Sequence, residues 1–126
     1  MAKIRIQVGR EEFDATLTEE TAPETVSKIL AALPIASSAK RWGEEIYFEI
    51  PVSMGEENAV DTVRKGDLGY WPEGACFCIF FGKTPMTTSE DEIKPASAVN
   101  PIGRIENPDA LKKHRAGETV RILPAA

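Results

Sequence analysis

Alternating hydrophobic and polar residues predict that the chain opens with a β-hairpin. Nearly every second residue of the segments 3–9 and 12–17 is apolar, which is the period of a half-buried strand. Gly9 ends the first segment, where a turn can bring the second strand back beside it. We therefore expect two paired strands, each with one face in the core.

Two segments carry the signals of helix starts. At residues 21–24, Thr21 is expected to cap the helix, a proline occupies its first turn and a glutamate completes a capping box. Apolar residues then recur at i, i+3, i+4 and i+7, and Pro34 is expected to end this helix. Asn-Pro-Asp at 107–109 predicts a second, short helix that continues through Arg115 and stops at Gly117.

Most of the remaining hydrophobic segments are of the β type. Further strands are expected at 35–42, 45–52, 59–63, 68–71, 75–81, 99–105 and 118–123. The small residues at 36–39 are expected to line a crowded barrel interior, and the polar segment 83–97 to form a long surface loop. About eight strands and two helices predict a single, mainly β domain over residues 1–126, a barrel with two capping helices.

Composition and charge narrow the range of partners. The 126 residues are 42% hydrophobic and 28% charged, as in an ordinary globular domain. The net charge of −5 argues against a nucleic-acid partner, which needs a basic face. No segment approaches the roughly 20 apolar residues that span a bilayer, and the amino terminus lacks a signal-peptide core. We expect no membrane partner and a cytoplasmic protein; the sequence carries no signal of oligomeric state.

The two cysteines, Cys76 and Cys78, are expected to be reduced thiols. At i and i+2 of a strand they share a face at a spacing that disfavours a disulfide. A Cys-x-Cys pair lacks the second ligand pair of a zinc site, and the only histidine, His114, is distant in sequence and expected to be solvated. Glu45 with Glu49, or Glu44 with Glu45, could be paired carboxylates, but nothing else indicates a sugar cleft. We expect no metal and no cofactor.

Several short motifs resemble those of the cyclophilins. Ala-Pro-Glu-Thr at 22–25 is similar to the start of the first cyclophilin helix. Tyr-Phe-Glu-Ile at 47–50 is similar to the strand that carries the catalytic arginine of that family, and Ile-Gly-Arg-Ile at 102–105 to a later strand.

A closer resemblance is to small prokaryotic proteins known as cyclophilin-like and uncharacterised. Their pattern is present as Trp-Gly-x-x-Ile-Tyr-Phe at 42–48, Gly-Asp-x-x-Tyr-Trp at 66–71 and Phe-Phe-Gly at 80–82. The resemblance covers nearly the whole chain. It implies a cyclophilin-like closed β-barrel of about eight strands with two capping helices.

The cyclophilin resemblance implies peptidyl-prolyl cis-trans isomerase activity, but the residues of that site are altered. The catalytic arginine falls on Glu49, a pocket glutamine on Cys76 and a substrate-lining phenylalanine on Cys78. The isomerisation barrier of about 18–20 kcal/mol comes from amide resonance, which a hydrogen-bond donor can weaken, whereas an ionised carboxylate only accepts. The sequence therefore predicts absent or very weak isomerisation. The alternative is an isomerase in which Arg41 or Arg104 supplies the donor.

Strand parity and the resemblance together predict a concave binding patch. An aromatic wall with a few polar groups suits a small ligand or a peptide. The predicted patch, with its edging residues last, consists of Tyr47, Glu49, Cys76, Cys78, Phe80, Trp71 and Arg41. The alternative is that these are ordinary outer-face side chains of a barrel. Trp42 and Trp71 lie at strand ends, where they either cover the barrel rim or stack on a ligand.

Overall fold

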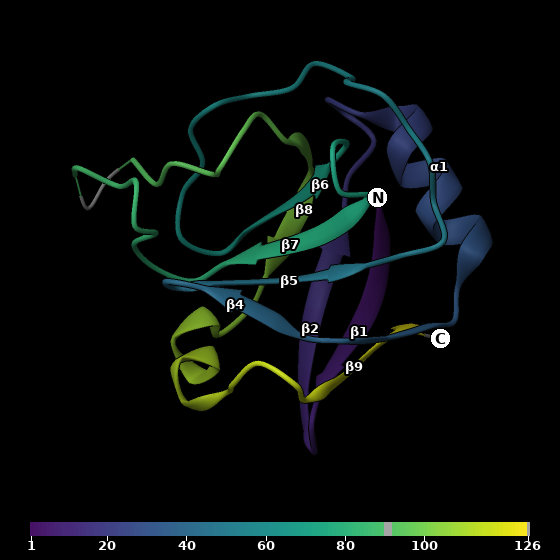
Figure 1. Ribbon diagram of the computed structural model, residues 1–126. Helices are drawn as coiled ribbons and strands as arrows, with labels where there is room; N and C mark the ends of the chain where they lie inside the picture. The colour runs from purple at the N-terminus through teal and green to yellow at the C-terminus, as the bar shows by residue number, and fades with distance from the viewer. Residues whose placement is uncertain (90–91, 126) are drawn as a thin grey trace.

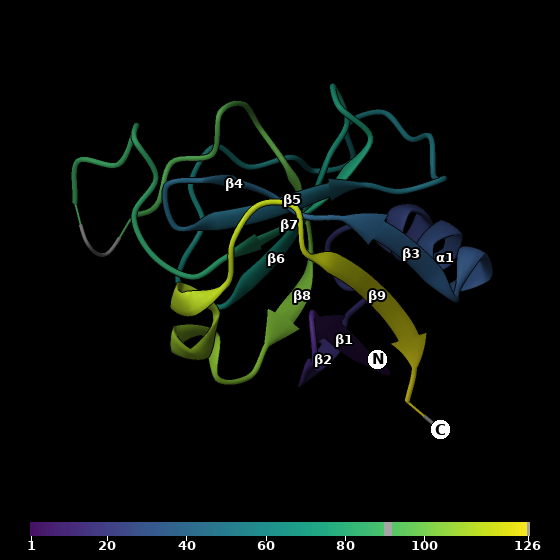
Figure 2. The ribbon, with the colours of Figure 1, turned by 60° about the horizontal axis from the view of Figure 1, so that its bottom comes forward.

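The computed structural model describes residues 1–89 and 92–125. Their strands form one antiparallel sheet that curls into a nearly closed barrel (Figure 1). The sheet has nine strands, in the order β3-β9-β1-β2-β8-β6-β7-β5-β4. The strands are β1 (Ala2–Val8), β2 (Glu11–Leu17), β3 (Ile35–Ser38), β4 (Lys40–Trp42), β5 (Glu45–Glu49), β6 (Asp67–Trp71), β7 (Cys76–Phe80), β8 (Asn100–Ile105) and β9 (Thr119–Pro124). Helix α1 (Pro23–Ala32) and the 3-10 helix η1 (Pro108–Lys113) lie on opposite sides of the barrel (Figure 2).

The barrel closes through the chain between β3 and β4. These consecutive strands lie at the two ends of the sheet order and are separated only by Ala39. The mainly β barrel with two helices is thus confirmed, although the single strand expected at 35–42 is divided in two. The expectation that small residues there fill the interior was wrong for Ala36 and Ser38, which are exposed. Strand alternation turns Ile35 inward, and these two residues lie on the solvent side.

The two helix starts differ from the capping expected of them. Ala22 precedes α1 and no side-chain cap comes from Thr21; instead the Glu57 carboxylate accepts hydrogen bonds from the backbone N–H groups of Glu24 at 3.1 Å and Thr25 at 2.9 Å. A distant loop therefore satisfies the donors that a local residue was expected to satisfy. The second helix is a 3-10 turn without a side-chain cap, and it ends at Lys113, before the predicted end.

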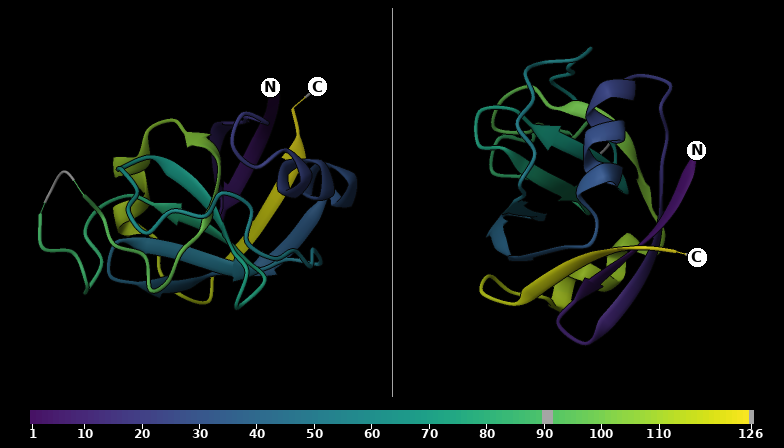
Figure 3. Two further views of the ribbon diagram at one scale, coloured as in Figure 1. Left: turned by 90° about the horizontal axis from the view of Figure 1, so that it is seen from above. Right: turned by 90° about the vertical axis from the view of Figure 1, so that its right-hand side faces the viewer.

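Buried aromatic and aliphatic side chains fill the inside of the barrel. Phe48 of β5 stacks on Phe77 of β7 with ring centroids 5.3 Å apart, and Tyr70 of β6 is fully buried beside them. Val26 and Ile29 bring the apolar face of α1 into the same core. The described residues of the segment between β7 and β8 extend from the barrel on the side away from the two termini (Figure 3).

His114 is buried, contrary to the expectation that it is solvated. Its ring nitrogens lie 2.9 Å from Glu118 Oε1 and 2.8 Å from Glu11 Oε1. Burial lowers the pKa of this imidazole, but the hydrogen bonds to the two carboxylates outweigh burial and raise the pKa above its ordinary value. His114 therefore helps to fix the end of η1 against β2.

Candidate functional site

Strands β5 and β7 bring most of the predicted patch residues onto one outer face. Their antiparallel register opposes Glu45 with Phe80, Tyr47 with Cys78, and Glu49 with Cys76. On the other side of β7, Trp71 of β6 opposes Cys76. Directly opposed residues of a sheet project to the same side, so the grouping by strand parity is confirmed.

This face is not an open patch, because two segments cover part of it. Residues near 60–63 and 93–99 pair through the isolated bridges Val60 with Val99 and Val63 with Ile93. Together with Cys76, Cys78 and Phe80 they form a second, smaller hydrophobic cluster outside the barrel: Val63, Cys76, Cys78, Phe80, Ile93 and Val99. Cys76 and Phe80 are thereby buried and do not line a cavity, contrary to the expectation of an accessible patch.

A small pocket remains where the cover ends, and we call it the aromatic pocket. Its volume is about 130 Å³. It is lined by Trp42, Glu45, Tyr47, Trp71, Cys78, Pro95, Ala96, Ser97 and Val99. Three of the predicted residues are therefore brought together here, namely Tyr47, Trp71 and Cys78. Glu45 and Trp42 join them because Trp42 of β4 directly opposes Glu45 in the register.

The aromatic walls of the pocket are held in a fixed arrangement. The rings of Tyr47 and Trp71 are perpendicular, with centroids 6.3 Å apart. The indole Nε1–H of Trp71 donates to Ser97 Oγ at 2.5 Å, and the Ser97 hydroxyl in turn donates to Glu73 Oε2 at 3.1 Å. These bonds join one wall of the pocket to the covering segment.

Glu45 is the ionisable group of the pocket. Only 6% of it is exposed, and burial raises the pKa of its carboxyl to about 7, against which a hydrogen bond with the Cys78 thiol acts in the lowering direction. In residues 1–89 and 92–125 no lysine, arginine or histidine forms an ion pair with it. Buried carboxylates usually have such a partner. The pocket thus contains a carboxyl that is partly ionised at neutral pH and lacks a counter-ion from the described chain.

The Cys78 thiol is a neutral group in this setting. It is fully buried, and burial together with the neighbouring Glu45 carboxyl raises its pKa well above the ordinary value. A nucleophilic or metal-binding cysteine needs the thiolate. Burial also raises the pKa of Cys76. These residues therefore act by packing and by a weak hydrogen bond, consistent with the reduced thiols expected from the sequence.

Besides the buried Cys76 and Phe80, two more of the predicted residues lie outside the lining of the aromatic pocket, Glu49 and Arg41. Glu49 is exposed at the end of β5, on the same face as the pocket but beyond its lining. Arg41 opposes Ile46 in the register and so projects to the other face. Its guanidinium donates to the carbonyls of Gly43 at 2.9 Å and His114 at 2.6 Å, and it lies over the ring of Phe81.

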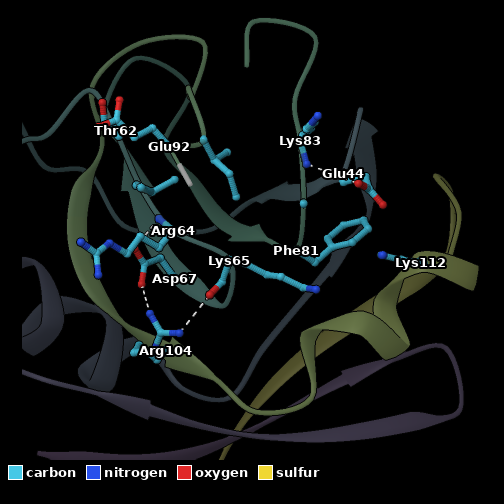
Figure 4. Close-up of a pocket in the computed structure, with 13 residues that line it drawn as sticks. Glu44, Thr62, Arg64, Lys65, Asp67, Phe81, Lys83, Glu92, Arg104 and Lys112 are labelled. Carbon is cyan, nitrogen blue, oxygen red and sulfur yellow. Dashed lines mark hydrogen bonds and ion pairs between the residues drawn. The ribbon is translucent and has the colours of Figure 1, made fainter. Parts of the chain in front are cut away.

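The second arginine considered as a replacement donor is also engaged elsewhere. The Arg104 guanidinium pairs with the Asp67 carboxylate and donates to the Lys65 carbonyl at 2.9 Å (Figure 4). It belongs to a separate, wide cleft of about 1260 Å³. Figure 4 shows that charged side chains of both signs surround this cleft. Lys65 and Lys112 there both pair with Asp109. Three cations of this cleft, those of Lys65, Arg104 and Lys112, thus form ion pairs with carboxylates of the protein. The Glu45 carboxyl of the aromatic pocket has no such partner in residues 1–89 and 92–125.

The described part of the chain shows neither a cluster of metal ligands nor a membrane-spanning helix. Residues 1–89 and 92–125 contain no cluster of three or more His, Cys, Asp or Glu side chains that could hold a metal ion. Neither helix among them is long and apolar enough to cross a bilayer.

A nearly closed barrel of nine antiparallel strands, with a helix on either side, has the architecture of a cyclophilin-type barrel. A family model described as Cyclophilin-like matches residues 2–123. The chain therefore belongs to the cyclophilin-like family. No curated protein matches it.

Two solved structures illustrate the relationship. The solution structure of a hypothetical protein, AF2241 from Archaeoglobus fulgidus, has a TM-score of 0.84 and 48% sequence identity, covering 98% of this chain and 95% of that one. A structure of McbB in complex with tryptophan has a TM-score of 0.74 and 16% identity. This alignment covers 98% of the present chain but only 45% of McbB, so the chain spans less than half of that protein. At this identity the similarity shows the fold alone.

Proposed function

We propose that this protein is a ligand-binding cyclophilin-like barrel that holds a small ligand, or a side chain of a peptide, in the aromatic pocket, without efficient prolyl isomerisation. The observation that carries the proposal is a buried carboxyl, that of Glu45, in a pocket that Trp42, Tyr47 and Trp71 also line. A largely apolar cavity with one or two polar groups that fix orientation is the usual form of a small-molecule site.

The size of the pocket favours a small group over an extended chain. Its volume of about 130 Å³ lies below the roughly 300–1,000 Å³ of typical ligand pockets. A head group or a single side chain fits this volume, whereas a prolyl dipeptide with its flanking backbone does not. McbB, which shares this fold over part of its length, has been solved in complex with tryptophan, which is a small molecule.

The charge at the pocket argues against isomerase chemistry. Glu49 stands where the resemblance puts the catalytic arginine, and the residues that line the pocket include no arginine or lysine. Arg41 and Arg104 donate to other groups of the protein. An isomerase with re-sited donors is the alternative that activity measurements decide. We also propose that the protein is cytoplasmic, because thiols such as Cys76 and Cys78 stay reduced in that compartment.

The experiment that tests ligand binding uses the two tryptophans of the chain, Trp42 and Trp71, both of which line the pocket. Their indole N–H signals in a proton–nitrogen correlation spectrum report on the pocket directly. We expect members of a library of small polar and charged fragments to shift both signals in a saturable manner. Fragments that bind only elsewhere, or a library in which none shifts either indole signal, would refute the proposal.

A further inference from the structure

We propose that the aromatic pocket selects an organic ammonium group, and a methylated one such as trimethylammonium in particular. This inference rests on the ligand-binding function proposed above and names the chemistry of the ligand. It comes from three features of the described residues: a buried carboxyl without a counter-ion, aromatic walls around it, and a shortage of hydrogen-bond acceptors.

The carboxyl supplies the charge complementarity. Glu45 is 6% exposed and has no cationic partner in residues 1–89 and 92–125. An ionised carboxylate is costly to bury unless a cation pairs with it. A bound cation would provide the missing charge, whereas an anionic ligand would place two negative charges together. The pocket therefore favours cationic over anionic ligands, whatever their shape.

The aromatic rings give the cation a second form of stabilisation. A cation within about 6 Å of a ring centroid is attracted to the face of the ring, most strongly for tryptophan. The perpendicular rings of Tyr47 and Trp71, 6.3 Å apart, form a corner in which one cation can meet this distance to both. Trp42 contributes a third ring to the same lining. Rings around a carboxylate form the kind of cage that suits quaternary ammonium ligands.

The remaining lining favours methyl groups over N–H donors. A primary ammonium carries three donors that each need an acceptor. Besides Glu45, the lining side chains offer two oxygen acceptors, the hydroxyls of Tyr47 and Ser97, and that of Ser97 already bonds to Trp71 and Glu73. Pro95 and its neighbours in the covering segment present apolar surface instead. Three N-methyl groups would bury against this surface without leaving a donor unsatisfied.

The volume is consistent with this head group. A trimethylammonium head is a compact group of four heavy atoms, which suits a pocket of only about 130 Å³. The same head occurs on free choline and at the end of a trimethylated lysine side chain, so either source presents the chemistry that the pocket recognises.

The test compares charged and neutral ligands of the same shape. Choline is titrated against 3,3-dimethyl-1-butanol, in which carbon replaces the charged nitrogen, and against N-acetyl-trimethyllysine amide, with the fluorescence and the indole signals of Trp42 and Trp71 as readouts. We expect binding of at least one ammonium compound at least about tenfold tighter than the neutral analogue, since a desolvated contact between a cation and an aromatic face contributes more than a tenfold effect. Whichever ammonium binds more tightly identifies its source.

Two near-isosteric variants make the outcome specific. Glu45→Gln should abolish the preference for the ammonium, while the matched control Glu49→Gln, on the same strand and outside the pocket lining, should retain it. Thermal melts of both variants establish that they are folded. Equal binding of choline and its neutral analogue, or an unchanged preference in folded Glu45→Gln, would overturn the ammonium inference. If fragments shift the tryptophan signals while no ammonium does, the inference fails and the ligand-binding function stands; if nothing shifts them, both fail.

Discussion

Replacing the buried carboxyl of Glu45 by an amide should change how stability depends on pH. In the variant Glu45→Gln, the side chain keeps its shape but can no longer ionise. Burial raises the pKa of Glu45 from the ordinary value of 4.5 to about 7. Between these two values the folded state binds more protons than the unfolded state, so the free energy of unfolding of the wild type falls as pH rises. The variant lacks this loss.

The size of the effect follows from the two pKa values. At 1.36 kcal/mol for each pKa unit, ionising Glu45 in the folded protein costs about 3 kcal/mol, fully expressed above pH 7. The wild type and Glu45→Gln should therefore be similarly stable near pH 4.5, and the variant should be more stable by about 3 kcal/mol at pH 8.5. This is a large fraction of the 5–15 kcal/mol that typically stabilises a domain.

The groups packed around Glu45 contribute little to the difference between the two proteins. Cys78 faces it from β7 and stays neutral because burial raises its pKa. Lys40 of β4 and Glu49 of β5 lie on the same face but outside the pocket lining, and the covering segment 95–99 contributes no ionisable side chain. Groups elsewhere, such as His114, titrate equally in both proteins and cancel in the difference.

The assay is urea unfolding of both proteins at several pH values from 4.5 to 8.5, followed by tryptophan fluorescence. Glu49→Gln serves as the control, because an exposed carboxyl should show no such divergence. A difference between wild type and Glu45→Gln that stays constant with pH, or a wild type more stable than the variant at pH 8.5, would refute the burial of an unpaired carboxyl.

Three further predictions test the site and its support. In a chymotrypsin-coupled assay with an Ala-Pro-Phe peptide, the wild type should give no rate above the uncatalysed one, and cyclophilin-like turnover would show an isomerase; a gain of turnover in Glu49→Arg would identify this position as the site of loss. Glu57→Ala should lower the free energy of unfolding by about 1–2 kcal/mol in urea, since it removes the acceptor for two backbone donors of α1, and no change would mean that water replaces the cap. His114→Gln should destabilise more at pH 5.5 than at pH 8.5, because a raised imidazole pKa stabilises the fold below its ordinary value of 6.5 and that stability is lost as pH rises through the folded pKa; an equal loss at both values contradicts an ion-paired imidazolium.

Strand alternation in the sequence was sufficient to predict the face on which the pocket lies. Tyr47, Trp71 and Cys78 were predicted together and line one cavity, because residues two apart share a face and the register of β5 and β7 keeps them opposed. The same alternation places Glu45 on this face, but the sequence does not show that Glu45 is buried there. No local pattern indicates that segments far apart in sequence would pair and cover the sheet there.

The remaining differences have the same non-local origin. The cap of α1 comes from Glu57, more than thirty residues after the helix start. The buried His114 forms hydrogen bonds with a carboxylate of β2 and with one in the turn before β9. Propensity and capping motifs describe neighbours in sequence, so they cannot specify such partners. Arg41 was placed at the patch although its strand turns it to the other face; parity within β4 was the signal that could have excluded it.

The most direct test of the account is a crystal structure with the ligand that produces the largest saturable shift of the two tryptophan indole signals. We predict electron density in the corner between Tyr47 and Trp71, in contact with the Glu45 carboxylate. Density in the charged cleft around Arg104 instead, with the aromatic pocket empty, would contradict the assignment of the ligand site.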